Sequence, residues 1–94
     1  MEQETKHLRI HGKAQGVYYR AWTKEKADRY GLKGWVRNVT RDRSVEALVT
    51  GHPDDIQKFI SECYNGPDAA NVTVIEVQDG VDEELGSFEI RDTL

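Results

Sequence analysis

The order in which hydrophobic periodicities follow one another most limits how this 94-residue chain can fold. Apolar and polar side chains alternate where a half-buried strand is expected, and apolar side chains recur every three or four positions where an amphipathic helix is expected. This pattern predicts a strand, a helix, two strands, a helix and two final strands. The predicted strands cover residues 6–12, 32–39, 45–49, 72–77 and 87–91, and the predicted helices cover residues 20–30 and 53–64.

The second predicted helix carries the clearest local signals. Pro53 suits the first position of a helix, and Asp54 and Asp55 complement the positive end of the helix dipole. Apolar side chains then recur at spacings of three and four, at Ile56, Phe59, Ile60, Cys63 and Tyr64. The run 65–67, Asn-Gly-Pro, stops the helix.

The order β-α-β-β-α-β permits two split βαβ units. We therefore predict an α+β fold, a ferredoxin-like split βαβ sandwich with an antiparallel sheet and two helices on one face. A chain of this length buries roughly 60 to 65% of its unfolded surface, so we expect residues 1–94 to form a single domain. Enzymes, metal carriers, ligand sensors and RNA-binding modules share this layout, so the function has to be argued from particular residues.

Composition excludes several classes of protein. The single cysteine, Cys63, excludes an internal disulfide and a multi-cysteine metal site, and it indicates a reducing compartment. No apolar run has membrane-spanning length, and the first residues lack the features of a signal peptide. His7, His11 and His52 are scattered, and His7 and His11 on the polar face of a strand are expected to be solvated side chains, not metal ligands. We expect a cytoplasmic monomer that has no metal, no cofactor and no membrane partner.

Charge is divided unevenly along the chain. Residues 1–45 hold 11 Lys and Arg against 5 Asp and Glu, whereas residues 46–94 hold 2 against 12, giving a net charge of −4. The basic half suits a small anionic substrate, and it also keeps nucleic acid as a minor alternative. RNA-recognition domains need exposed aromatic side chains on their central strands, and residues 7–10 and 44–50 contain none. We therefore expect no nucleic-acid partner.

Residues 11–20 follow an alternating strand and end in Arg20, where a helix is expected to begin. Backbone N–H groups in a curved loop and at a helix N-terminus favour a bound phosphate or carboxylate. Arg20 adds a planar fork of donors that matches phosphate oxygens. The predicted phosphate-binding loop contributes the backbone of Gln15, Gly16, Val17, Tyr18 and Tyr19. It lacks the Gly-Lys-Ser/Thr ending of a nucleotide P-loop, so ATP or GTP binding is not supported. An ordinary strand-to-helix turn with a surface arginine is the alternative.

Two motifs, at residues 15–20 and 34–38, resemble the acylphosphatase pattern. The resemblance runs from about Leu8 to Val72, and Phe88 and Ile90 resemble the closing strand of the family. It implies metal-independent hydrolysis of the carboxyl–phosphate bond of small acyl phosphates, giving a carboxylate and inorganic phosphate. In this interpretation Arg20 binds the phosphate and Asn38 positions the attacking water.

The sequence also departs from that pattern. Tyr18 stands where the family usually has glycine, Ala14 where it usually has valine, and Tyr19 where phenylalanine is common. The loop after Asn38 is one residue longer, and Arg43 stands where a turn glycine is expected. Both proposed catalytic residues are nevertheless present.

The chemistry of the residues agrees with this interpretation. An acyl phosphate already carries a good leaving group, so its hydrolysis mainly requires a charge-neutralised phosphoryl group and a water in line with it. The amide of Asn38 can hold a water through both its donor and its acceptor. Two alternatives remain at this point. Asn38 could simply cap the strand that it ends, and the chain could be a noncatalytic ferredoxin-like module that senses phosphate or another anion or binds RNA.

Overall fold

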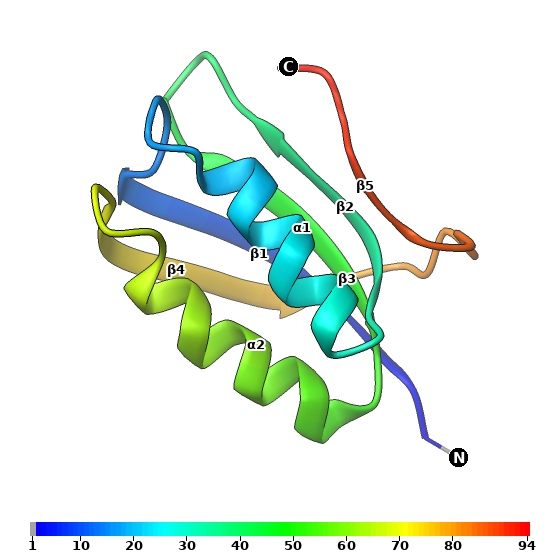
Figure 1. Cartoon of the computed structure of the whole chain (residues 1–94). Helices are drawn as coiled ribbons and strands as arrows, with labels where there is room; N and C mark the ends of the chain where they lie inside the picture. Colours follow the sequence, from blue (N-terminus) through cyan, green and yellow to red (C-terminus); the bar gives the residue numbers. More distant parts are fainter. Residues whose placement is uncertain (1) are drawn as a thin grey trace.

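The computed structural model describes residues 2–94, which form one sheet and two helices (Figure 1). The helices are α1 (Tyr19–Arg29) and α2 (Pro53–Asn65). The strands are β1 (Glu4–Lys13), β2 (Lys33–Asn38), β3 (Val45–Gly51), β4 (Asn71–Asp79) and β5 (Phe88–Ile90). All seven predicted elements are present, with ends that differ by up to two residues.

The sheet has the strand order β4-β1-β3-β2-β5, and both helices cover the same face (Figure 1). β1 pairs antiparallel with β3 and with β4, and β2 pairs antiparallel with β3. The predicted ferredoxin-like sandwich is therefore confirmed. The antiparallel sheet is confirmed for the four strands β1 to β4, and β5, for which the sequence indicated no partner, adds a fifth strand that pairs in parallel with β2. The segment between β4 and β5 crosses from one edge of the sheet to the other. The alternation of apolar and polar side chains in a strand as short as β5 does not indicate which strand it pairs with or in which direction.

The main core lies between the sheet and the helices. Alternate residues in the middle of β1 and along β3 face the helices and are fully buried, namely Leu8, Ile10, Val45, Ala47 and Val49. The helices contribute Tyr19, Thr23, Ala27, Ile56, Phe59 and Cys63. Tyr64, which was expected on the apolar stripe of α2, is instead 46% exposed. Because successive helical residues are rotated by about 100°, Tyr64 lies well to one side of the stripe that ends at Cys63.

The opposite face of the sheet carries ion pairs. His7 hydrogen-bonds to Glu46 at 2.6 Å and His11 to Glu76 at 2.7 Å. Both side chains are 29% exposed and thus partly solvated as expected, but each also has a carboxylate partner that the sequence did not indicate. Strand pairing on both sides of β1 places a carboxylate beside each ring. His52, the third histidine, is the N-cap of α2, where its Nδ1 accepts a hydrogen bond from the Asp54 backbone N–H at 3.1 Å.

Trp35 is buried on this same face although no helix covers it. The guanidinium groups of Arg37 and Arg91 stack on its ring at 4.7 and 5.1 Å from the centroid. Its indole N–H donates to Glu83 at 3.2 Å. The segment that leads to β5 therefore contributes to covering this ring.

No group of three or more His, Cys, Asp or Glu side chains within residues 2–94 is arranged to hold a metal ion. In that same range, neither helix is long and apolar enough to cross a membrane.

Candidate active site

The loop between β1 and α1 turns sharply because two of its residues have positive φ. Gly16 has φ 74°, and Tyr18, the N-cap of α1, has φ 69° and ψ 21°. A Cβ on Gly16 would meet no other atom within 4 Å. Glycine is therefore favoured there by its backbone conformation and not by lack of space.

The side chain of Gln15 ties this loop to the turn between β2 and β3. Its Nε2 donates to the carbonyl oxygens of Val39 at 3.0 Å and Ser44 at 2.8 Å. The backbone N–H of Val39 donates to the same Ser44 oxygen at 2.9 Å. The loop after β1 is thus held beside the end of β2. The sequence analysis assigned only the backbone of Gln15 a role and missed this contact, which has no local signal in the sequence.

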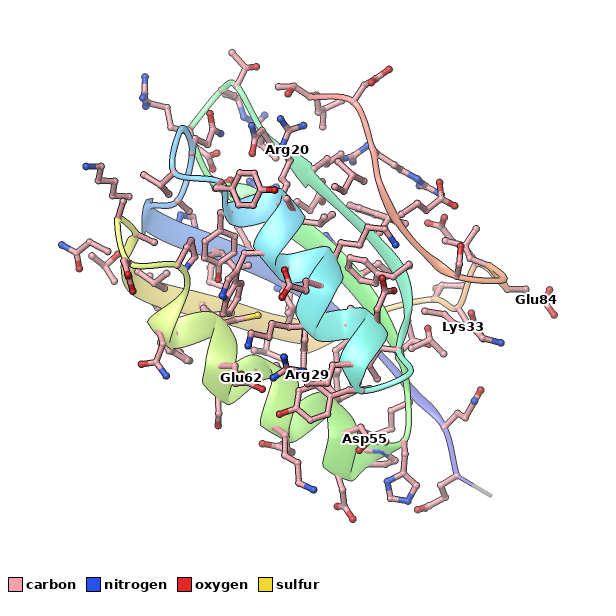
Figure 2. All side chains as sticks on the ribbon, viewed as in Figure 1. Arg20, Arg29, Lys33, Asp55, Glu62 and Glu84 are labelled. Carbon is pink, nitrogen blue, oxygen red and sulfur yellow. The ribbon has the colours of Figure 1, made fainter. Side chains whose placement is uncertain are left out.

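A pocket of about 300 Å³ lies where these segments meet. It is lined by Ala14, Gly16, Tyr18, Tyr19, Arg20, Ala21, Asn38 and Ile90. Arg20 and Asn38, which come from different motifs, therefore face one cavity. Figure 2 shows Arg20 projecting from the first turn of α1, at the end of the helix where this pocket lies. Of the predicted loop, Gly16, Tyr18 and Tyr19 line the pocket, whereas Gln15 and Val17 do not; Val17 packs against the core.

Two polar side chains that line the pocket, Arg20 and Asn38, lack protein partners in the described part of the chain. Within residues 2–94, neither the guanidinium of Arg20 nor the side-chain amide of Asn38 makes a hydrogen bond or an ion pair to the protein. The backbone of Asn38 is nevertheless fixed, because it pairs with Val45 and its carbonyl accepts a hydrogen bond from the N–H of Leu94 at 2.9 Å. The turn after β2 is capped by Asp42, whose Oδ1 accepts hydrogen bonds from the Ser44 N–H and hydroxyl. The amide of Asn38 is therefore left available to a ligand.

Comparison with known proteins gives consistent results. The acylphosphatase family model matches residues 6–90. An acylphosphatase from Azoarcus sp. (strain BH72) is 48% identical over 86 residues, which is 92% of this chain and 87% of the relative. The crystal structure of acylphosphatase from Bacillus subtilis superposes with a TM-score of 0.88 at 31% identity, covering 96% of this chain and 99% of that one. An acylphosphatase from Coxiella burnetii superposes with a TM-score of 0.89 at 30% identity, covering 95% of this chain and 93% of that one.

The chain belongs to the acylphosphatase family. This confirms the family predicted from the motifs at residues 15–20 and 34–38. It also favours the enzyme over the noncatalytic phosphate-sensing or RNA-binding module that the sequence analysis left open.

Two of the departures from the acylphosphatase pattern have a shared structural consequence. Tyr18 and Arg43, which stand where glycine was expected, both adopt the left-handed conformation, with φ 69° and 60°. Such a conformation costs an L-residue about 1–2 kcal/mol. The backbone at both positions thus has the form that a glycine would adopt, so the loop retains its shape at an energetic cost.

The sequence analysis did not assign a role in the site to Ile90 or to the small residues Ala14 and Ala21. Ile90 lines the pocket because the chain returns to the β2 edge of the sheet before β5 begins. The sequence indicated only that Ile90 shares a strand face with Phe88. Phe88 is buried, whereas Ile90 is 43% exposed at the pocket.

Asp42 makes the turn beside the site sensitive to acid. Hydrogen bonds from the Ser44 hydroxyl and N–H, with the nearby Arg9, lower the pKa of Asp42 to about 2 from an ordinary value of 3.8. A carboxyl group with a lowered pKa stabilises the folded protein at pH values above its ordinary pKa, and that stabilisation is lost as the pH falls from about 4 towards 2.

Asp42→Asn should therefore reduce the loss of melting temperature between pH 5 and pH 2. Asp68→Asn, which removes an exposed carboxylate, is the matched control. Identical acid profiles for wild type and Asp42→Asn would contradict this assignment.

Proposed function

We propose that this member of the acylphosphatase family hydrolyses the carboxyl–phosphate bond of small acyl phosphates, without a metal or cofactor, and releases a carboxylate and inorganic phosphate. The observation that carries the proposal is that Arg20 and Asn38, whose side chains have no protein partner among residues 2–94, line the same pocket at the start of α1. The other cationic side chains that line a pocket have different surroundings. Arg9 on the opposite face, for example, is paired with Asp42 at 2.9 Å.

Arg20 and the start of α1 supply the binding site for the phosphoryl group in this proposal. The N-terminus of a helix carries partial positive charge and free backbone N–H groups, both of which favour an anion. The first turn of α1 contains no acidic residue that would repel one. Arg20 adds a charge-assisted, bidentate contact that fixes the orientation of the phosphate as well as its position.

Asn38 positions the attacking water in this proposal. The leaving group is a carboxylate, which departs without a proton, so the site does not need a strong general acid. Tyr19 is a poor candidate for a general base, because its hydroxyl donates to the Cys63 carbonyl at 2.5 Å and burial raises its pKa. A neutral amide with one donor and one acceptor group can orient a water without removing its proton. Orientation and charge neutralisation therefore supply the catalysis.

The remaining parts of the proposal concern partners and setting. Residues 1–94 act as a single domain and as a cytoplasmic monomer, with no nucleic-acid partner. What supports the last point is the face of the sheet away from the helices, where His7, Arg9 and His11 are each paired with a carboxylate. The aromatic ring of this face, Trp35, is buried under Arg37 and Arg91 and is not exposed for base stacking.

The direct test of the proposed function is release of inorganic phosphate from benzoyl phosphate by the purified protein. Turnover should persist after exhaustive treatment with EDTA, because the proposed mechanism uses only protein groups. Activity that disappears with EDTA and returns with magnesium or zinc would contradict the metal-independent mechanism. Absence of hydrolysis in a folded, phosphate-binding protein would leave a noncatalytic phosphate sensor as the function.

Arg20→Ala should lower kcat/KM for benzoyl phosphate by at least about 100-fold and weaken competitive inhibition by phosphate, because a charge-assisted contact is lost. Arg20→Lys should restore little, since a point charge does not reproduce the guanidinium fork. Arg29→Ala is the matched control, because Arg29 lies in the last turn of the same helix, at the end opposite Arg20 (Figure 2). Undiminished phosphate inhibition in Arg20→Ala would remove this residue from the site.

Asn38→Ala separates catalysis from binding. If Asn38 orients the water, kcat should fall by about 100-fold or more, while the inhibition constant for phosphate stays within about twofold of wild type. If Asn38 only terminates the strand, the variant should lose thermal stability and retain kcat. Melting temperature, phosphate inhibition and kcat are therefore measured on the same preparation. A folded Asn38→Ala protein with normal turnover would exclude the catalytic role.

A further inference from the structure

Tyr18 combines backbone strain with a side chain that stabilises nothing in the protein. It is the N-cap of α1 in the left-handed conformation, yet its side chain forms no capping hydrogen bond. It is 76% exposed, and its hydroxyl makes no hydrogen bond to any part of the chain described here. Residues kept in such conformations cluster at ligand sites, where the strain is part of the function. The ring of Tyr18 is therefore free to contact a ligand.

The walls of the pocket differ in polarity. Arg20 and Asn38 supply the polar groups, and Tyr18 and Ile90 supply exposed apolar surface beside them. Ala14 and Ala21 keep the space between these walls open with their small side chains. A volume of about 300 Å³ lies at the lower end of the range for small-molecule sites, so a ligand of one ring plus a phosphate suits it.

We propose that Tyr18, together with Ile90, forms the subsite for the acyl group, so that this chain prefers acyl phosphates with an aromatic or branched apolar acyl group over acetyl phosphate. This inference rests on the proposed function. The phosphoryl group binds Arg20, and the acyl group then contacts the ring of Tyr18 and the side chain of Ile90. A phenyl ring can stack on the tyrosine, whereas a methyl group presents much less apolar surface to either side chain. Discrimination thus arises from the part of the substrate that does not react.

Tyr18→Gly is the informative variant, because glycine adopts a positive φ readily and should leave the loop intact. The kcat/KM for benzoyl phosphate should fall roughly three- to tenfold, mainly through KM, which is the range expected for losing one aromatic contact. The readout is the ratio of kcat/KM for benzoyl phosphate to that for acetyl phosphate, which should fall by a similar factor, because any effect of the loop backbone on phosphate binding acts on both substrates. Tyr18→Phe keeps the ring and should retain the preference. Ile90→Ala should shift it in the same direction as Tyr18→Gly.

Glu84→Gly is the matched control for relief of backbone strain. Glu84 also has a positive φ, of 56°. Figure 2 shows it on the segment between β4 and β5, far from Arg20. This variant removes the same kind of strain without touching the pocket, so the substrate preference should not change. A change in preference equal to that of Tyr18→Gly would attribute the effect to strain and overturn the subsite.

Binding of methylphosphonate and benzylphosphonate, measured by calorimetry, separates failure of this inference from failure of the proposed function. Neither compound is hydrolysed, so the comparison does not depend on activity. Wild type should bind benzylphosphonate more tightly, and Tyr18→Gly should lose that advantage. An unchanged preference in Tyr18→Gly, or equal losses for both compounds and for phosphate, would overturn the acyl subsite even if benzoyl phosphate is hydrolysed. Absence of hydrolysis with the phosphonate preference intact would instead reject only the proposed function.

Discussion

The position of Val45 between two neighbouring strands determines where the candidate site can form. Val45 pairs with Ile10 of β1 on one side and with Asn38 of β2 on the other. Because β3 is antiparallel to both neighbours, β1 and β2 run in the same direction and end at the same edge of the sheet. The loop that follows β1 and the residue that ends β2 therefore lie next to each other. Gln15 then fixes their separation through its two hydrogen bonds to Val39 and Ser44.

The contrast between paired and unpaired polar groups distinguishes the two faces of the sheet. On the face away from the helices, Arg9 pairs with Asp42 and Arg37 with Glu46, and the guanidinium groups of Arg37 and Arg91 cover Trp35. At the end of the molecule where α1 begins, Arg20 and Asn38 have no partner among the described residues. What sets these two groups apart is that they come from different segments of the chain and line the same pocket. In the proposed function, this end of the molecule is where the phosphoryl group binds.

Strain and burial act together in the loop that supports this site. Tyr18 and Arg43 hold left-handed conformations on the two loops that Gln15 connects. Tyr19 anchors the same region to the core, since its ring is buried and its hydroxyl satisfies the Cys63 carbonyl in the last turn of α2. The buried ring of Tyr19 thus attaches the strained loop to the core.

The sequence alone determined those features that depend on neighbouring residues. Pro53 and Gly66 mark the ends of α2, alternation around Leu8 and Ile10 marks β1, and the two motifs around Arg20 and Asn38 identify the family. Only the tertiary structure decided the parallel pairing of β5, the carboxylate partners of His7 and His11, the supporting role of Gln15 and the presence of Ile90 in the pocket. Local conformational preferences act over a few residues and can be recognised along the chain. Contacts between distant segments depend on strand order and register, which are set by packing of the whole sheet against its helices.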